Sequence, residues 1–173
     1  MNKLLIVVDM QNDFVSGALG SNEARAIVPN VKAKIEKYAE NKDLIIFTKD
    51  THNSHYDETQ EGQKLPIPHC MYMSEGWELC DEIKDLERFG SSVEKMTFGF
   101  LDWEYLIDRQ DISEIEIIGL CTDICVVSNA IIIKNFFSEI PVTVDASCCA
   151  GTTPEKHIAA LNTMESCQIN ILR

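Results

Sequence analysis

The chain has few of the features that mark membrane, secreted or nucleic-acid-binding proteins. No apolar run is long enough to cross a bilayer, and the first one, Leu4–Val8, ends at Asp9, too soon for a signal peptide. Basic residues are scarce, with 15 Lys and Arg against 28 Asp and Glu. The resulting net charge of −13 argues against nucleic acids and anionic membranes as partners.

The cysteines lack the spacings of the common metal-binding and disulfide frameworks. None of the seven forms a C-x-x-C pair, which argues against a zinc finger. Their number is odd, and a chain of this size needs no covalent staples. We therefore expect reduced thiols and a cytoplasmic protein.

Linkers, repeats and nucleotide fingerprints are also missing. No Pro-, Gly- or Ser-rich stretch divides the chain, so residues 1–173 are expected to form one domain with a full core. No G-x-G-x-x-G follows the first apolar run, which argues against a dinucleotide cofactor.

Short apolar runs alternate with segments of helix length. This alternation predicts a three-layer α/β/α, doubly wound domain with a mainly parallel sheet, whose ligands bind beyond the carboxyl ends of the strands. The apolar segment 124–137 is expected to be buried or to lie at a subunit contact, so a homo-oligomer is predicted. The predicted strands are 3–9, 43–50, 115–118, 140–144 and 168–172, and the predicted helices are 31–40 (after Pro29), 124–137 and 155–166.

Residues 115–130 predict a strand, a glycine turn and a buried helix in quick succession. Thr122 and Asp123 are suitable helix-capping residues, so Cys125 falls in the first helical turn. Free N–H groups and the helix dipole favour a thiolate there and could also bind an oxyanion. The alternative is a small buried cysteine that packs the helix against the sheet.

Carboxylates and histidines gather after the predicted strands. Asp9 ends the first strand, and Asp50 and His52 follow the second, two residues apart. The long loop 51–90 also contains His69. One carboxylate and two imidazoles suit a divalent metal, most plausibly zinc, with manganese or iron as alternatives. Ordinary surface histidines would show the same spacing.

Several motifs follow one another in a familiar order along nearly the whole chain. The motifs are Val7-Val8-Asp9-Met10-Gln11-Asn12-Asp13-Phe14 with Gly17-Ala18-Leu19, Asp50-Thr51-His52, Pro68-His69-Cys70, Glu94-Lys95 with Phe98 and Phe100, and Gly119-Leu120-Cys121-Thr122-Asp123-Ile124-Cys125-Val126. Together they resemble the motifs of the isochorismatase-like cysteine hydrolases, in particular the nicotinamidase branch.

The resemblance implies a catalytic triad of Asp9, Lys95 and Cys125. It also implies a cis peptide between Leu120 and Cys121, with the backbone N–H groups of Cys121 and Cys125 as the oxyanion hole. The cysteine would attack the carbonyl of a small carboxamide such as nicotinamide, ammonia would leave, and water would hydrolyse the thioester.

The remaining site residues are also expected from the resemblance. The fourth metal position falls on Glu61, beside Asp50, His52 and His69. Phe14 and Trp103 are expected to offer a stacking face to the substrate, because Pro66 stands where nicotinamidases often carry an aromatic residue. This departure leaves other substrates open, such as a carbamoyl compound or isochorismate. A non-catalytic binding protein is the third possibility, although the intact triad argues against it.

Overall fold

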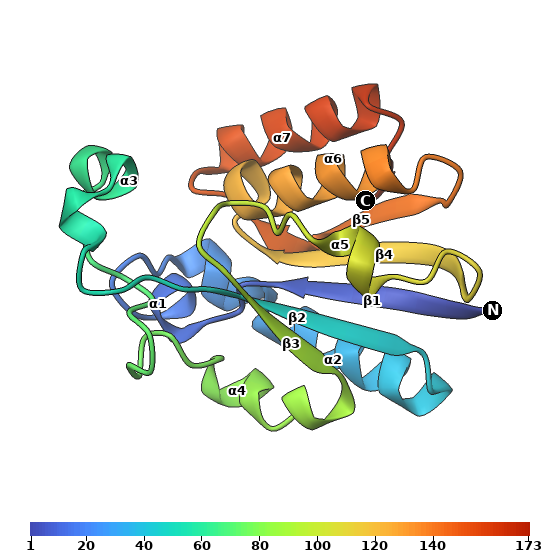
Figure 1. Ribbon diagram of the computed structural model, residues 1–173, viewed down its shortest axis with the longest axis horizontal. Coiled ribbons are helices and arrows are strands. Elements are labelled where there is room, and N and C mark those ends of the chain that lie inside the picture. Colours follow the sequence, from blue (N-terminus) through green and yellow to red (C-terminus); the bar gives the residue numbers. More distant parts are fainter.

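Six parallel strands form one sheet at the centre of the computed structural model, which describes residues 1–173 (Figure 1). The spatial order is β3-β2-β1-β4-β5-β6, so the chain starts in the middle of the sheet and winds outward in both directions. This confirms the predicted doubly wound fold. The strands are β1 (Asn2–Val8), β2 (Leu44–Asp50), β3 (Ser91–Lys95), β4 (Ile112–Leu120), β5 (Val142–Ala150) and β6 (Asn170–Leu172).

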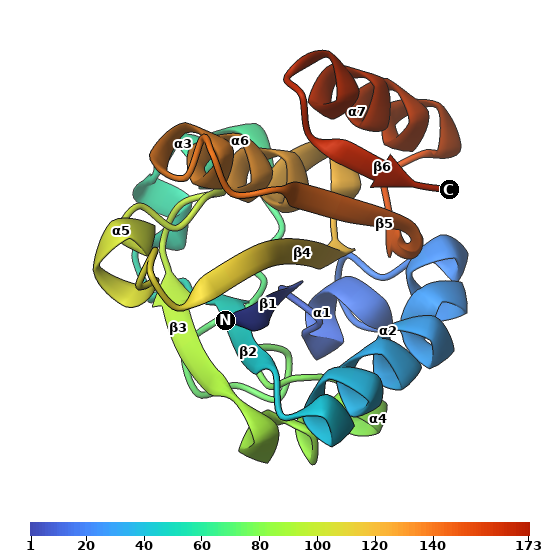
Figure 2. The same ribbon diagram turned by 90° about the vertical axis from the view of Figure 1, so that its right-hand side faces the viewer.

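Helices cover both faces of the sheet. The layer with α2 and α4 lies on one face and the layer with α5, α6 and α7 on the other (Figures 1 and 2). The short α1 and α3 lie at the carboxyl ends of the strands, where α3 projects from the body (Figure 1). No helix is both long and apolar enough to cross a membrane. The helices are α1 (Asn12–Val15), α2 (Asn22–Asn41), α3 (Gln60–Lys64), α4 (Asp81–Lys84), α5 (Trp103–Leu106), α6 (Val127–Phe136) and α7 (Pro154–Ser166), with 3-10 turns η1 (Tyr56–Glu58) and η2 (Glu87–Phe89) and a π-helical turn η3 (Thr122–Val126).

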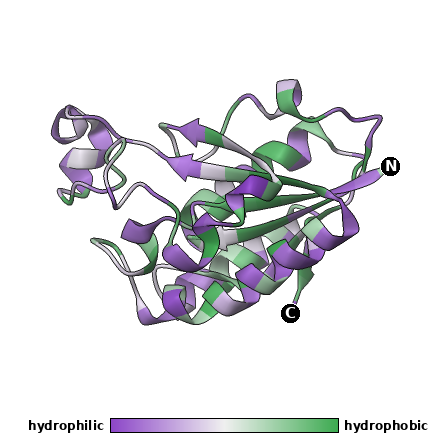
Figure 3. Ribbon diagram, turned by 90° about the horizontal axis from the view of Figure 1, so that it is seen from below, coloured by the Kyte–Doolittle hydropathy of each residue, from purple (hydrophilic) through white to green (hydrophobic).

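The sheet separates two apolar cores. Successive residues of β1 point to opposite faces, so Leu5 and Val7 join the core under α2, while Leu4, Ile6 and Val8 join the core under α6. Figure 3 shows the hydrophobic strands between helices that carry hydrophilic residues on their outer turns. Burial on both faces explains why these strands are continuous apolar runs in the sequence.

The first long helix begins earlier than predicted. α2 starts at Asn22, where the Ser21 side chain accepts a hydrogen bond from the Ala24 N–H, and Pro29 lies inside the helix. Proline removes one helical hydrogen bond, and burial of the apolar face of α2 against the sheet offsets this loss. The predicted start of this helix after Pro29 was therefore wrong.

A buried ion cluster joins α2 to the sheet away from the strand ends. Lys34 Nζ lies 2.5 Å from Glu116 Oε1 on β4 and 2.8 Å from Asp145 Oδ2 on β5. The Tyr38 hydroxyl donates to the other Glu116 oxygen at 2.6 Å. Although burial opposes it, these carboxylates raise the pKa of Lys34, and Lys34 and Ser147 lower the pKa of Asp145.

Replacing Lys34 by methionine should lower the free energy of unfolding by roughly 3–5 kcal/mol, because two buried carboxylates lose their counterion. Lys37→Met, on an exposed turn of the same helix, is the matched control and should have little effect. Urea unfolding measures both variants.

The wild type should also lose stability in acid as the pH falls through the lowered pKa of Asp145, since protonation ends its ion pair. Equal stabilities of the two variants at pH 7 would contradict a structural role for this cluster.

Candidate active site

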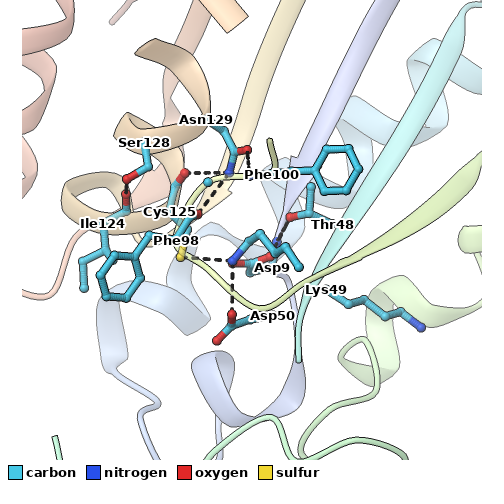
Figure 4. Close-up of polar contacts among 12 residues, drawn as sticks. Asp9, Thr48, Lys49, Asp50, Phe98, Phe100, Ile124, Cys125, Ser128 and Asn129 are labelled. Carbon is cyan, nitrogen blue, oxygen red and sulfur yellow. Dashed lines mark hydrogen bonds and ion pairs between the residues drawn. The ribbon is translucent and has the colours of Figure 1, made fainter. Parts of the chain in front are cut away.

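Four ionisable side chains meet beyond the carboxyl ends of the strands (Figure 4). Lys95, the last residue of β3, places its Nζ 2.7 Å from Asp9 Oδ2 and 3.4 Å from Cys125 Sγ. The same Nζ lies 3.3 Å from Asp50 Oδ1. All four residues are buried. The structure thus brings the three residues of the expected triad together, although they come from three separate parts of the sequence.

Asp9 directly follows β1, and its backbone turns sharply there. Its φ of 48° lies in the left-handed region, which is unfavourable for a residue other than glycine. Thr48 on the neighbouring strand holds it in place, donating from its hydroxyl to Asp9 Oδ1 at 2.6 Å. The other oxygen, Oδ2, faces Lys95 but accepts no well-aligned hydrogen bond. Thr48 is therefore the partner of Oδ1, and the Lys95 ammonium, 2.7 Å away, is the partner of Oδ2.

Cys125 lies in the π-helical turn η3, directly after β4. The peptide bond between Leu120 and Cys121 is cis, and Gly119 before it has a φ of 120°. A side chain at Gly119 would collide with the carbonyl oxygen of Val8, so close approach of the two strands requires glycine. The Cys121 N–H donates to no group of the protein, which leaves it free as an oxyanion donor.

The expected helix caps in this turn have other partners. The Asp123 carboxylate accepts from the N–H and hydroxyl of Thr152, which precedes α7. The Thr122 hydroxyl lies 2.7 Å from His157 Nδ1 on α7. The prediction of local caps was wrong, because tertiary contacts with α7 use these side chains instead.

The surroundings of Cys125 favour a thiol over a resting thiolate. Burial raises the pKa of Cys125, the Asp9 charge adds to this, and Lys95 only partly opposes them. Burial also raises the pKa of the Asp9 carboxyl, which makes it a stronger base. Although burial opposes it, the negative groups around Lys95, Asp9 first and then Cys125 and Asp50, together raise its pKa, so Lys95 stays protonated. The helix terminus alone predicts a lowered pKa for this thiol, and burial together with the Asp9 charge reverses that direction.

A second group of side chains could hold a metal ion beside the triad. Donor atoms of Asp50, His52, Glu61 and His69 all lie within 4.8 Å of one another. His69 Nδ1 lies 2.8 Å from the Ile67 carbonyl oxygen, a contact that leaves the lone pair of Nε2 for a metal. Two imidazoles and two carboxylates fit zinc, manganese or iron. Glu61 reaches the group from α3, and the structure thus gathers all four expected ligands.

One carboxylate links the two groups. Asp50 Oδ2 lies 3.0 Å from His52 Nε2 and 3.5 Å from His69 Nε2, while Oδ1 faces Lys95. Although burial opposes it, the two histidines and Lys95 hold the pKa of Asp50 well below its usual range. Asp50 is therefore ionised, as a metal ligand must be.

A small, mostly apolar pocket opens onto Cys125. Its volume is about 170 Å³, below the usual range for drug-sized ligands. Phe14 lines it, with its ring centroid 5.5 Å from that of His69. The lining residues that sequence reasoning did not assign are Leu19, Lys64, Leu65, Phe98 and Ile124.

Trp103 does not line this pocket, so the prediction that it stacks on the substrate was wrong. It is fully buried in the core under α6, where its Nε1 donates to Asn129 Oδ1 at 3.0 Å. Phe98, which is partly exposed and precedes it in sequence, reaches the pocket instead. A tryptophan at the start of a short helix gives no local signal of which way its ring points.

This chain is similar in sequence and in fold to several known proteins. The PncA protein of Bacillus subtilis, an uncharacterised isochorismatase family protein, is 26% identical over 94% of this chain and 93% of its own. A crystal structure described as nicotinamidase/pyrazinamidase PncA from Bacillus subtilis is 28% identical, with a TM-score of 0.89 over the whole of both chains. Pyrazinamidase of Pyrococcus horikoshii in complex with zinc is 27% identical, with a TM-score of 0.87 over 100% of this chain and 99% of that one.

The family assignment covers almost the complete chain. A nicotinamidase of Schizosaccharomyces pombe is 23% identical over 97% of this chain and 91% of its own. The model of the isochorismatase domain matches residues 3–173, which include every candidate site residue. The chain therefore belongs to the isochorismatase family.

Proposed function

We propose that this protein is a cysteine-dependent amidohydrolase that converts a small carboxamide such as nicotinamide to the acid and ammonia. The observation that carries the proposal is the position of Lys95 Nζ, in contact with both the Asp9 carboxylate and the Cys125 sulfur at the end of an apolar pocket. The names of the relatives, nicotinamidase and pyrazinamidase, support the same reaction class.

The first half of the reaction uses the triad. The Asp9 carboxylate takes the thiol proton as the Cys125 sulfur attacks the amide carbonyl carbon. The Cys121 N–H, joined by that of Cys125, donates to the oxyanion of the tetrahedral intermediate. Asp9 then gives the proton to the leaving nitrogen, and ammonia departs from the thioester.

The second half restores the enzyme with the same groups. Asp9 takes a proton from a water molecule, whose oxygen attacks the thioester carbonyl. The carbon–sulfur bond breaks, the acid is released and Cys125 regains its proton from Asp9. Lys95 remains protonated throughout and offsets the negative charge that passes between Asp9 and Cys125.

A divalent ion, most plausibly zinc, would be held at one side of the pocket by Asp50, His52, Glu61 and His69. When bound, this ion supplies a Lewis acid that can bind a ring nitrogen or polar edge of the substrate. Cys125 is the nucleophile and has its own base and oxyanion donor. The metal side of the pocket is therefore needed to bind and orient the substrate.

The substrate is a single-ring or short-chain amide. The pocket is small, and Phe14, beside His69, and Phe98 are its aromatic lining residues. Leu19, Leu65 and Ile124 add aliphatic side chains to the lining. Measurement of ammonia release over a panel of amides, with nicotinamide, pyrazinamide, carbamoyl amino acids and short aliphatic amides, tests the assignment. Turnover of none of them by the zinc-, manganese- or iron-loaded protein would refute it.

Replacing His52 by alanine should raise KM at least about tenfold, because the binding side of the pocket loses a ligand whereas the nucleophile is untouched. Alkylation of Cys125 by a small electrophile should continue at close to the wild-type rate. His55→Ala is the matched control, since His55 is exposed and lies outside the cluster.

Complete metal removal provides the complementary test. The stripped protein should lose most of its activity, and zinc should restore it. Normal turnover after verified removal would contradict the proposed binding role of the metal.

We further propose that the protein works in a reducing compartment, consistent with the cytoplasmic expectation, because all seven cysteines are free thiols.

The homo-oligomer remains a prediction. The segment after β3 carries the exposed apolar residues Met96, Phe98 and Leu101. Its backbone bonds to Asn129 of α6, and a subunit contact at this segment would cover these residues.

A further inference from the structure

The residues that follow Asp9 support the segments that carry the proposed metal ligands. Three successive side chains, Gln11, Asn12 and Asp13, each bond to backbone groups of the segment 50–77. Most of this segment has no regular secondary structure apart from η1 and α3. It therefore depends on outside contacts to hold its histidines and carboxylates in place.

Gln11 clamps the backbone of Asp50. Its side-chain oxygen accepts from the Asp50 N–H at 2.8 Å, and its Nε2 donates to the Asp50 carbonyl at 2.8 Å. The same Nε2 donates to the Trp77 carbonyl at 2.9 Å. Gln11 and Asp50 are both buried, so no water can replace the two hydrogen bonds between them.

Asp13 acts on the residue that directly follows the ligand His69. Its Oδ2 accepts from the N–H of Cys70 at 2.8 Å, next to His69. The Cys70 carbonyl in turn accepts from the His52 N–H at 3.0 Å. Cys70 has a φ of 46°, an unfavourable backbone conformation that these hydrogen bonds help to maintain.

The Asp13 carboxylate is tightly enclosed. A Cβ at Gly76 would collide with its side-chain oxygens, so the loop passes directly over it only because residue 76 is glycine. Its other oxygen, Oδ1, accepts from the Ala18 N–H at 3.3 Å. This enclosure fixes the position of Asp13 relative to the loop.

From these contacts we infer that Gln11 and Asp13 are positioning residues for the metal site, an inference that rests on the proposed metal-dependent function. Gln11 sets Asp50, and Asp13 sets His52 and His69 through Cys70. Because both lie within four residues of Asp9, one short segment places the metal ligands relative to the triad. Neither side chain lines the substrate pocket itself, so each acts through the ligands it holds.

The zinc Kd tests this inference directly. Gln11→Met keeps the side-chain volume but removes the three hydrogen bonds, and Asp13→Asn replaces one acceptor oxygen by an amide of the same shape. Each should weaken zinc binding about 10- to 100-fold, the usual effect of losing a group that orients a ligand. Competition with a chromophoric chelator measures the Kd of the full-length protein without reference to its activity.

Asn129→Leu is the matched control, because Asn129 is an equally buried amide that bonds to backbone groups on the Cys125 side of the site. It should lower the melting temperature as Gln11→Met does, yet leave the zinc Kd unchanged. If Gln11→Met does not fold, Asp13→Asn decides the question.

Two results would overturn the inference, and they differ in meaning. Wild-type zinc affinity in a folded Gln11→Met or Asp13→Asn protein would refute the positioning role alone. Failure of the wild type to bind zinc, manganese or iron would refute the metal site of the proposed function as well.

Discussion

Replacing Cys125 by alanine should lower kcat by on the order of 10⁴-fold or more, because the thioester cannot form without the sulfur. The fold should survive, since the loss of one buried sulfur costs only about 1 kcal/mol. The zinc Kd should also stay at its wild-type value, as Cys125 is no member of the ligand group. Steady-state ammonia release and thermal unfolding check the two parts.

Cys121→Ala is the control for this loss. Cys121 lies in the same pocket and the same turn, but the proposed mechanism uses only its backbone N–H. The variant should therefore keep most of the activity. Normal turnover by Cys125→Ala, or a comparable loss in both variants, would refute Cys125 as the nucleophile.

Asp9→Asn and Lys95→Ala should each lower kcat by about 10³-fold or more, and the double variant should be hardly worse than the poorer single one. The reason is geometric: Lys95 contacts both Asp9 and Cys125, so loss of either member disables the same proton transfer. Kinetics of the two single variants and the double variant form the complete cycle.

Lys49→Met controls for the removal of a buried lysine. Lys49 is 5% exposed and pairs with Glu87 away from the triad, so its loss should destabilise the fold and spare kcat. The kcat of the double variant could instead fall by the product of the two single losses. That result would mean that Asp9 and Lys95 act independently, and it would contradict a shared mechanism.

The metal site and the triad are expected to influence each other through Asp50. One of its oxygens faces the two histidines and the other faces Lys95. A divalent ion would draw negative charge away from Lys95 and strengthen its interaction with Asp9 and Cys125. Gln11 holds the backbone of this same residue, which is why a change far from the substrate can affect both parts of the site.

Local patterns were sufficient for the fold because the sheet is buried on both faces. The run Leu4–Val8 and the run Leu44–Phe47 are apolar for this reason, and the polar residues directly after them had to lie at the strand ends. The same reasoning predicted that Asp9 and Asp50 lie close together at the carboxyl ends of the strands. The position of Cys125 after a glycine turn could also be read from the sequence.

Side-chain directions and tertiary partners could not be read in this way. Trp103 looked like a stacking residue but points into the core, and Asp123 looked like a local cap but binds Thr152. The raised pKa of Cys125 results from burial and from the Asp9 charge, neither of which a helix terminus reveals. Thr48, which holds Asp9, stands at the end of an apolar run, and its hydroxyl was the only signal of its role.

The account depends most on a covalent bond between Cys125 and the acyl part of the substrate. The direct test is to mix the enzyme with an amide labelled in its acyl group, quench in acid at successive times and map the labelled peptide by mass spectrometry. We predict a transient acyl adduct on the peptide that contains Cys125, removed on a longer incubation as the acid appears. Label on a different residue, or steady formation of the acid with no enzyme-bound label at any time, would contradict the thioester mechanism.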